Sequence, residues 1–254
     1  MGSLEGKTAL VTGASRGIGR AIAQRLAADG ALVAIHYGSN HTAAKETLHD
    51  ITTSGGRAFT LHAPLGDPEH IPALYQQLDT HLTSLNQPTT LDILVNNAGF
   101  HIPGTIHTTT SHDFDELINI HARIPLFLIQ HALPRIPQGG RIINISSAAT
   151  RVAHPTALAY SMAKAALETL THTLAKELGP QHITINNIAP AFIKTDLNRH
   201  RWDTPTQAAA TAAHSTFNRI GDPTDIADIT AFLASHNSRW ITGQTIDATG
   251  GTHL

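Results

Sequence analysis

A tyrosine and a lysine four residues apart, Tyr160 and Lys164, are the pair in this chain whose types and spacing best suit chemistry. Residues four apart lie on the same face of a helix, so the ammonium group can sit beside the phenol. A free phenol has a pKa of about 10 and is a poor proton shuttle at neutral pH, whereas a neighbouring cation favours its ionised form. The pair alone is weak evidence, because an ordinary helix with one packed and one solvated residue has the same spacing.

A glycine-rich segment at residues 12–19, with the sequence TGASRGIG, follows the first apolar run of the chain. Glycines let the backbone turn sharply and approach a pyrophosphate, whose charge a helix N-terminus can meet. The spacing is GxxxGxG rather than GxGxxG. Because the segment lies at the first strand–helix junction, it predicts a dinucleotide site rather than a simple turn.

The residues after the second apolar run indicate which dinucleotide binds. A site that prefers NAD carries an acidic residue there for the ribose hydroxyls, but no carboxylate occurs between Asp29 and Glu46. Arg16 lies in the glycine-rich segment instead, and Ser39 offers a donor. A guanidinium is well suited to a 2′-phosphate. The sequence therefore predicts NADPH over NADH, with Arg16 as a solvated loop cation the remaining alternative.

Apolar runs that read as buried strands alternate with helical patterns along the chain. Strands are expected at residues 8–12, 32–36, 58–62, 91–96, 141–146, 183–188 and 244–247. Helices are expected at 17–30, 41–54, 68–85, 113–133, 156–178 and 223–235. This alternation predicts an α/β fold with one Rossmann-type, doubly wound parallel sheet of about seven strands and helices on both faces. We expect a single domain over residues 1–254, with the irregular segment 194–222 as a substrate lid.

Composition excludes several classes of protein. Lys and Arg number 17 against 19 Asp and Glu, and this near balance argues against nucleic-acid and membrane-surface partners. The chain has no cysteine, which excludes disulfides and thiolate metal sites. None of its 18 histidines has the HExxH spacing, so we expect no metal, and His107 and His112 read as surface residues. With no signal sequence and no 18-residue apolar run, we expect a soluble cytoplasmic protein.

Several segments in order resemble the short-chain dehydrogenase/reductase family over essentially the whole chain. They are TGASRGIG at 12–19, NNAG at 96–99, Asn119, Ser147, YSMAK at 160–164, Asn187 near the end of the sixth expected strand, and Pro190 and Thr195 after it. Ser147 lies 13 residues before Tyr160, which is the usual family interval. The closest likeness is to bacterial 3-oxoacyl-ACP reductases and to the ketoreductases of aromatic polyketide pathways.

The resemblance implies four catalytic residues, Asn119, Ser147, Tyr160 and Lys164. Tyr160 would be the general acid toward a carbonyl oxygen, and Lys164 would lower its pKa and hold the nicotinamide ribose. Ser147 would hydrogen-bond the carbonyl oxygen, and Asn119 would anchor a water relay. General chemistry agrees, because a hydride that reaches a carbonyl carbon generates an alkoxide that needs a donor and a proton.

The resemblance also implies the residues that contact NADP(H). The NNAG segment would line the adenosine-ribose side, and the residues after the sixth strand would contact the nicotinamide end. The predicted set is Gly13, Ser15, Arg16, Gly17, Ile18, Gly19, Tyr37, Ser39, Leu65, Asn97, Ala98, Gly99, Tyr160, Lys164, Pro190, Ile193 and Thr195.

Two positions near the cofactor depart from the family pattern. The usual Asp-Val after the third strand is Pro64-Leu65 here, so only the Leu65 backbone is expected at the adenine, unless Asp67 substitutes. Ala191 replaces the common glycine after Pro190 and adds a methyl group near the nicotinamide, with activity expected to be retained.

The substrate side also departs from the pattern of reductases that act on carrier-bound chains. Gln138 and Gln181 stand where such reductases place basic residues for an acidic carrier, although Arg135, Arg141 and Lys176 are close by. This change favours a diffusible ketone. Three aromatic residues, Trp202, Phe192 and Phe217, are either a roof over a bulky substrate or the lid's own core.

These observations favour an NADPH-dependent carbonyl reductase that converts a ketone, of polyketide type or a 3-oxoacyl group, to a secondary alcohol. Such an enzyme is an NADP-dependent oxidoreductase acting on CH–OH and C=O groups. Two alternatives are an NAD(P)-dependent alcohol or sugar dehydrogenase that works in the oxidative direction, and a catalytically silent NADP-binding regulator. From the resemblance we also expect a homotetramer, or a dimer, built from the two long helices and the last strand.

Overall fold

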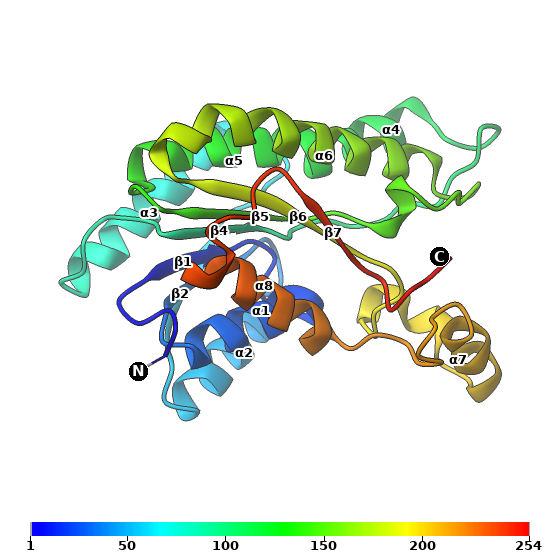
Figure 1. Ribbon diagram of the computed structural model, residues 1–254, viewed down its shortest axis with the longest axis horizontal. Helices are drawn as coiled ribbons and strands as arrows, with labels where there is room; N and C mark the ends of the chain where they lie inside the picture. The colour runs from blue at the N-terminus through cyan, green and yellow to red at the C-terminus, as the bar shows by residue number, and fades with distance from the viewer. Residues whose placement is uncertain (1, 254) are drawn as a thin grey trace.

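The computed structural model describes residues 2–253, and a single parallel sheet runs through it (Figure 1). Its strands follow the order β3-β2-β1-β4-β5-β6-β7, and all neighbouring pairs are parallel. The strands are β1 Thr8–Val11, β2 Leu32–Tyr37, β3 Arg57–His62, β4 Ile93–Asn96, β5 Arg141–Ile145, β6 Thr184–Pro190 and β7 Thr245–Ala248. Because the strand order reverses between β1 and β4, a ligand crevice is expected at the carboxyl ends of these strands.

Helices cover both faces of the sheet (Figure 1). Within residues 2–253 they are α1 Gly17–Ala28, α2 His41–Thr53, α3 Ile71–Ser84, α4 Ser111–Ile118, α5 Ile124–Ala132, α6 Leu158–Leu178, α7 Pro205–Ala212 and α8 Pro223–Ala234. Helices α1, α2 and α8 lie on one face, and α3, α5 and α6 lie on the other. The predicted fold class is confirmed. No helix in this part of the chain is long and apolar enough to cross a membrane.

Each face of the sheet has its own hydrophobic cluster. Ile22 and Leu26 of α1 belong to one cluster, together with Ala231 of α8. Leu74 and Leu78 of α3 belong to the other and are fully buried, as their spacing predicts. Each buried aliphatic side chain contributes about 1.5–3 kcal/mol to the stability of the fold. Packing on both faces also holds the strand ends in fixed positions.

A row of buried polar side chains crosses the sheet in register. Asn96, Asn144 and Asn187 oppose one another on β4, β5 and β6, and Asn187 opposes Thr245 on β7. The Asn96 amide donates to Asn144 Oδ1 at 2.8 Å, and the Asn144 amide donates to Thr171 Oγ1 of α6 at 2.8 Å. The Thr171 hydroxyl donates to Asn187 Oδ1 at 2.6 Å, and the Asn187 amide donates to Thr245 Oγ1 at 3.0 Å. A one-residue slip of any strand would break these bonds, so the row fixes the register.

Two segments differ from the sequence-based expectation. The long helix predicted over 113–133 is present, but five residues within it, Asn119–Arg123 between α4 and α5, form a π-helical turn. The segment 194–222 contains a 3-10 helix, Asp196–Arg201, and the unpredicted helix α7. Helix α7 begins with a capping box in which the Thr204 and Gln207 side chains each bind the other's backbone.

Candidate active site

The carboxyl ends of β1, β4, β5 and β6 border a cavity of about 610 Å³. All four predicted catalytic residues line it. The predicted cofactor residues that also line it are Gly13, Ser15, Arg16, Gly17, Ile18, Gly19, Ser39, Leu65, Asn97, Ala98, Gly99, Pro190, Ile193 and Thr195. Tyr37 does not line the cavity, since its side chain is buried and its hydroxyl shares a 2.7 Å hydrogen bond with His41 Nδ1.

The glycine-rich turn adopts a conformation that only glycine fits. Gly13 has a φ of +64°, and a Cβ there would lie 2.9 Å from Ala98 Cα. A Cβ on Gly19 would lie 2.3 Å from the carbonyl oxygen of Gly13. The NNAG segment holds the turn in place, because the Asn97 amide donates to the Thr12 carbonyl oxygen at 2.9 Å. The Asn97 side chain is thus engaged in fixing the turn.

Helix α1 begins at the cavity without a side-chain cap and without an acidic residue in its first turn. Its first N–H groups therefore keep a positive partial charge with no internal partner, which suits a phosphate group. Arg16, which precedes the helix, and Ser39, which follows β2, both line the cavity and are exposed. These donors fit a dinucleotide with a 2′-phosphate.

His36 supports the turn from behind, a role that the sequence analysis did not predict. Its Nε2 donates to the Ala63 carbonyl oxygen at 2.9 Å, and its Nδ1 accepts from the Gly13 N–H at 3.2 Å, a tautomer assigned from this network. Burial lowers the pKa of His36 to about 4, so the ring stays neutral at physiological pH. The neutral ring is the form that can accept from Gly13.

Helix α6 places Tyr160 and Lys164 on one face, as their spacing predicts. The Lys164 Nζ donates to the Ile145 carbonyl oxygen at 2.6 Å and lies 5.7 Å from the centre of the Tyr160 ring. Burial lowers the pKa of Lys164 to about 7, and the charge of Glu168 opposes this shift. The ammonium group is therefore close to losing its proton at neutral pH.

Burial raises the pKa of Tyr160, and the Ser147 hydroxyl acts in the opposite direction. This direction differs from the expectation that Lys164 lowers the pKa of the phenol. The physical reason is that both groups are removed from water, and Lys164 is itself only partly charged near neutral pH. The phenol thus keeps its proton, which it needs in order to act as an acid toward a carbonyl oxygen.

Ser147 and Asn119 complete the predicted catalytic set. The Ser147 hydroxyl accepts from the Ala149 N–H at 3.2 Å, which fixes its position at the end of β5. The Asn119 amide donates to the Gly66 carbonyl oxygen at 2.7 Å, while its Oδ1 is buried and has no partner among residues 2–253. A buried acceptor without a partner is costly unless water or a ligand binds it, so Asn119 suits a water relay.

Two histidines that the sequence analysis missed flank the Tyr160 ring. The ring centres of His101 and His121 lie 5.0 and 5.1 Å from that of Tyr160, each at an interplanar angle of 89°. His121 is buried, and its Nε2 donates to the Phe100 carbonyl oxygen at 2.7 Å. Burial and the charge of Lys164 hold the pKa of His121 well below its usual value. The sequence did hold a signal for both, because His101 lies two residues after the NNAG segment and His121 lies two residues after Asn119.

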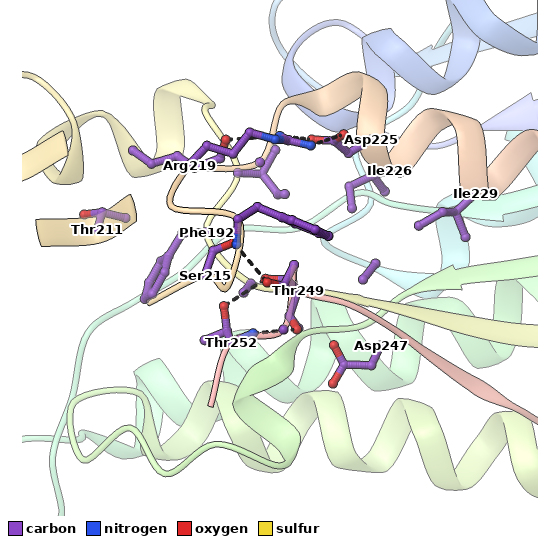
Figure 2. A pocket seen from close by; sticks show the side chains of 18 residues that line it. Phe192, Thr211, Ser215, Arg219, Asp225, Ile226, Ile229, Asp247, Thr249 and Thr252 are labelled. Carbon is purple, nitrogen blue, oxygen red and sulfur yellow. Dashed lines mark hydrogen bonds and ion pairs between the residues drawn. The ribbon is translucent and has the colours of Figure 1, made fainter. Parts of the chain in front are cut away.

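A second cavity of about 380 Å³ lies under the segment that joins α7 to α8 (Figure 2). Phe192 and Phe217 line it, and the Arg219 guanidinium is paired there with the Asp225 carboxylate. Neither aromatic residue lines the cavity that holds Tyr160, and Trp202 lines neither cavity. The three aromatic residues therefore do not form one roof over the site.

Other polar residues near the site have structural partners. The Asp67 carboxylate accepts from the Glu69 N–H at 2.9 Å, caps a short helix and does not line the cavity. The Arg135 guanidinium is paired with the Asp79 carboxylate at 2.6 Å. Arg141 is buried and donates to main-chain carbonyl groups, including Ser235 at 3.3 Å. Neither arginine is free to meet an acidic carrier protein.

Comparisons with known proteins agree on the family and the fold. A family model described as enoyl-(acyl carrier protein) reductase matches residues 13–253. The solved structure of the promiscuous reductase LugOII, which catalyses keto-reduction at C1 during lugdunomycin biosynthesis, is 46% identical, with a TM-score of 0.96 over 99% of this chain and 100% of that one. The angucycline C-6 ketoreductase LanV with bound NADP is 46% identical, with a TM-score of 0.94 over 99% of this chain and 97% of that one. The hydroxynaphthalene reductase-like protein Arp2 of Metarhizium majus is 36% identical over 98% of this chain and 96% of its own length.

Proposed function

This chain belongs to the short-chain dehydrogenase/reductase family, and we propose that it is an NADPH-dependent ketoreductase that reduces a ketone of an aromatic polyketide to a secondary alcohol. The observation that carries this proposal is the placement of Tyr160, Lys164 and Ser147 in one cavity with the glycine-rich turn. The likeness to LugOII and LanV supports the substrate class, because the first catalyses a keto-reduction in lugdunomycin biosynthesis and the second is an angucycline C-6 ketoreductase.

The residues of the cavity fit NADPH by their shape and charge. The α1 N-terminus suits the pyrophosphate, and Arg16 with Ser39 suits the 2′-phosphate. When bound, the cofactor supplies the hydride that reduces the carbonyl carbon. Pro190, Ile193 and Thr195 line the same cavity near Lys164 and would border the nicotinamide.

The chain's own residues would position the ketone and deliver its proton. The Ser147 hydroxyl would donate a hydrogen bond to the carbonyl oxygen, and the Tyr160 phenol would donate the proton that neutralises the developing alkoxide. Lys164 would then restore the proton of Tyr160, since the pKa of about 7 lets its ammonium group release one at neutral pH. Asn119 Oδ1 would hold the water that links Lys164 to solvent.

Three features support a diffusible ketone as the substrate. Gln138 and Gln181 replace basic residues at the expected carrier-docking positions. The nearby Arg135 pairs with Asp79, and Arg141 is buried. A carrier protein presents an acidic surface, so it would find few free cations here.

We also propose that residues 1–254 form one domain, with residues 194–222 as its lid, in a cytoplasmic homotetramer. Exposed apolar side chains support the assembly. Leu126 of α5 and Met162 of α6 are 40% and 49% exposed, and Trp240, close to β7, is 96% exposed. These side chains lie on the two long helices and beside the last strand, where the proposed interfaces between subunits would form.

The test is an NADPH-oxidation assay with trans-1-decalone, 1-tetralone and an acetoacetyl thioester, run on the wild type and on Tyr160→Phe. We expect Tyr160→Phe to lower kcat by about 10²–10⁴-fold, because it removes the proton donor and leaves the ring in place. NADPH binding, followed by its fluorescence, should change little. Turnover that survives this substitution undiminished would refute the mechanism.

Tyr75→Phe is the matched control. It removes a buried hydroxyl that donates to the Leu128 carbonyl oxygen at 2.8 Å, away from the cavity, and should leave kcat unchanged below its unfolding temperature. Two other outcomes point to the alternatives. Oxidation of alcohols without reduction of any ketone would indicate a dehydrogenase, and tight NADPH binding without turnover would indicate a regulator.

A further inference from the structure

The loops that follow β4, β5 and β6 bring cationic and aromatic side chains together beside Tyr160. His101, from the loop after β4, lies 5.0 Å from the Tyr160 ring. His154, from the loop after β5, lies 6.3 Å from the ring of Phe192. The guanidinium of Arg201, in the segment after β6, lies 4.8 Å from the centre of the Phe192 ring. These loops follow the strands whose carboxyl ends border the cavity, so their side chains lie at the edge of the sheet from which a ketone would reach Tyr160.

Arg201 is the permanent positive charge of this group. Burial lowers the pKa values of His101 and His154, and the charge of Arg201 is the next cause for both. The charge of Arg201 thus disfavours a proton on either ring. Both histidines are neutral near pH 7, whereas an arginine keeps its charge at any physiological pH.

The guanidinium of Arg201 is not paired with a carboxylate. Among the ion pairs formed within residues 2–253, none involves Arg201, although the exposed Asp196 and Asp203 lie in the same segment. Asp247 is paired instead with Arg151. The main chain of Arg201 is held against α7, because the Thr211 hydroxyl donates to its carbonyl oxygen at 2.7 Å. The guanidinium of Arg201 is thus half-buried, held in place over an aromatic ring and without a counter-ion. Such a group can bind an anion.

Building on the proposed function, we infer that Arg201 selects aromatic ketones that carry an anionic group, such as a carboxylate or an ionised phenol. The guanidinium binds the anion, and the rings of His101, beside Tyr160, and His154 pack against the ring system. The anion of the substrate thus holds the ketone in the orientation that Tyr160 requires, while the reacting carbonyl lies farther along the ring system. Binding energy from a remote group orients the reacting centre in this way.

The test compares a neutral ketone, 1-tetralone, with its anionic 6- and 7-carboxylates, in the wild type, Arg201→Gln and Arg199→Gln. Arg199 is the matched control, because it is an exposed arginine of the same 3-10 helix and its charge does not affect His101 or His154. We expect the wild type to prefer one carboxylate over 1-tetralone by tenfold or more in kcat/KM. Arg201→Gln should remove this preference, through a KM about 10–100-fold higher for that carboxylate. It should leave the KM for 1-tetralone unchanged, and Arg199→Gln should resemble the wild type.

Several outcomes would overturn the inference. One is a wild type with the same kcat/KM for the neutral and the charged ketones. Another is an Arg201→Gln variant in which the KM rises equally for both kinds of ketone, since that result means that the guanidinium only holds the lid. If no ketone is reduced at all, the proposed function fails, and the inference is read separately from the dissociation constants of these ketones for the NADPH-loaded protein. Equal carboxylate affinity in the wild type and in Arg201→Gln would then overturn it.

Discussion

Lys164 carries an ionisable head group into a buried position, so the residue proposed to assist catalysis also destabilises the fold. Its pKa is about 7 in the folded protein, against an ordinary value of 10.5. Between these values the unfolded chain binds the extra proton, so the contribution of Lys164 to stability rises as the pH increases from 7 to about 10.5. Below pH 7 the residue is at its most destabilising. A site residue under such strain commonly limits the stability of an enzyme.

We expect Lys164→Met to abolish ketone reduction and to raise the free energy of unfolding at pH 7 by about 1–3 kcal/mol. This figure is the desolvation free energy that the substitution removes, minus the free energy of the hydrogen bond to Ile145 that it loses. Urea unfolding at pH 7 and pH 9 checks it, and the gain should shrink at the higher pH. Lys176→Met, at an exposed position of the same helix, should change neither quantity. A Lys164→Met variant less stable than the wild type at pH 7 would contradict this account.

At the residue scale, the sequence predicted the polar residues of the site but not the side chains that surround them. Tyr160 and Lys164 could be predicted, because i, i+4 spacing is a local property of one helix. His101 and His121 could not, because each meets the Tyr160 ring only after separate loops and helices have packed together. The catalytic roles themselves stay predictions until the variants are measured.

At the scale of elements, the start of α1 combines two separate attractions for phosphate. The uncapped N–H groups of the helix suit the pyrophosphate whatever the cofactor, whereas the Arg16 side chain suits only the additional 2′-phosphate. The two contributions can be separated, because a side-chain substitution at Arg16 leaves the backbone donors in place.

Arg16→Gln should therefore raise the KM for NADPH by about 10–100-fold, the equivalent of one hydrogen bond to a charged group. The KM for NADH should stay the same, because NADH has no 2′-phosphate. Initial rates with both cofactors measure this, and Lys45→Gln, which removes an exposed cation of α2, serves as the control. Equal changes for NADPH and NADH would show that Arg16 acts on the turn rather than on the phosphate.

The elements that the sequence failed to predict each contribute residues to one of the two cavities. Predicted strand and helix limits agree with the structure to within about two residues over most of the sheet. The π-helical turn at Asn119 was missed, because its apolar spacing continues that of the flanking helices. Helix α7 was missed, because a polar segment rich in Ala and Thr has little periodicity, although its Thr204–Gln207 capping box was a usable signal.

On the scale of the whole molecule, burial of histidine makes the fold sensitive to acid. His36, His101, His121 and His154 all have lowered pKa values, chiefly because of burial. Where a histidine has a lower pKa in the folded state, the unfolded state binds more protons as the pH falls below about 6.5. Each buried histidine then removes stability, and the loss continues down to its folded pKa, which is about 4 for His36.

We expect the free energy of unfolding to fall by about 2 kcal/mol between pH 6.5 and pH 5.5, mostly through His36 and His121. Urea unfolding at several pH values measures the slope. His36→Gln should make the slope smaller, even though the variant loses two hydrogen bonds and is less stable at pH 7.5. His107→Gln, at an exposed position, should leave the slope unchanged. A stability that does not vary over this range would contradict the proposed neutral state of the buried histidines.

The order of the strands could be predicted only in outline. Alternating strands and helices fix a parallel sheet, because right-handed crossovers leave few other arrangements. The register of β4, β5 and β6 could not be read from their apolar runs, since runs that are buried on both faces have no alternation. The asparagines at the same level of each strand supply that information, and their pairing is visible only in the folded protein.

The same row of asparagines limits how the sheet can change by mutation. Replacing Asn144 alone leaves the amide of Asn96 buried without a partner, at about 1–3 kcal/mol, and removes one of the two hydrogen bonds of the Thr171 hydroxyl. An apolar side chain is tolerated there only if the facing positions of two other strands and of α6 become apolar in the same step. Stepwise mutation would therefore pass through intermediates of low stability, and we expect the members of the row to change together. Ser147, three residues beyond Asn144, keeps its place as a result.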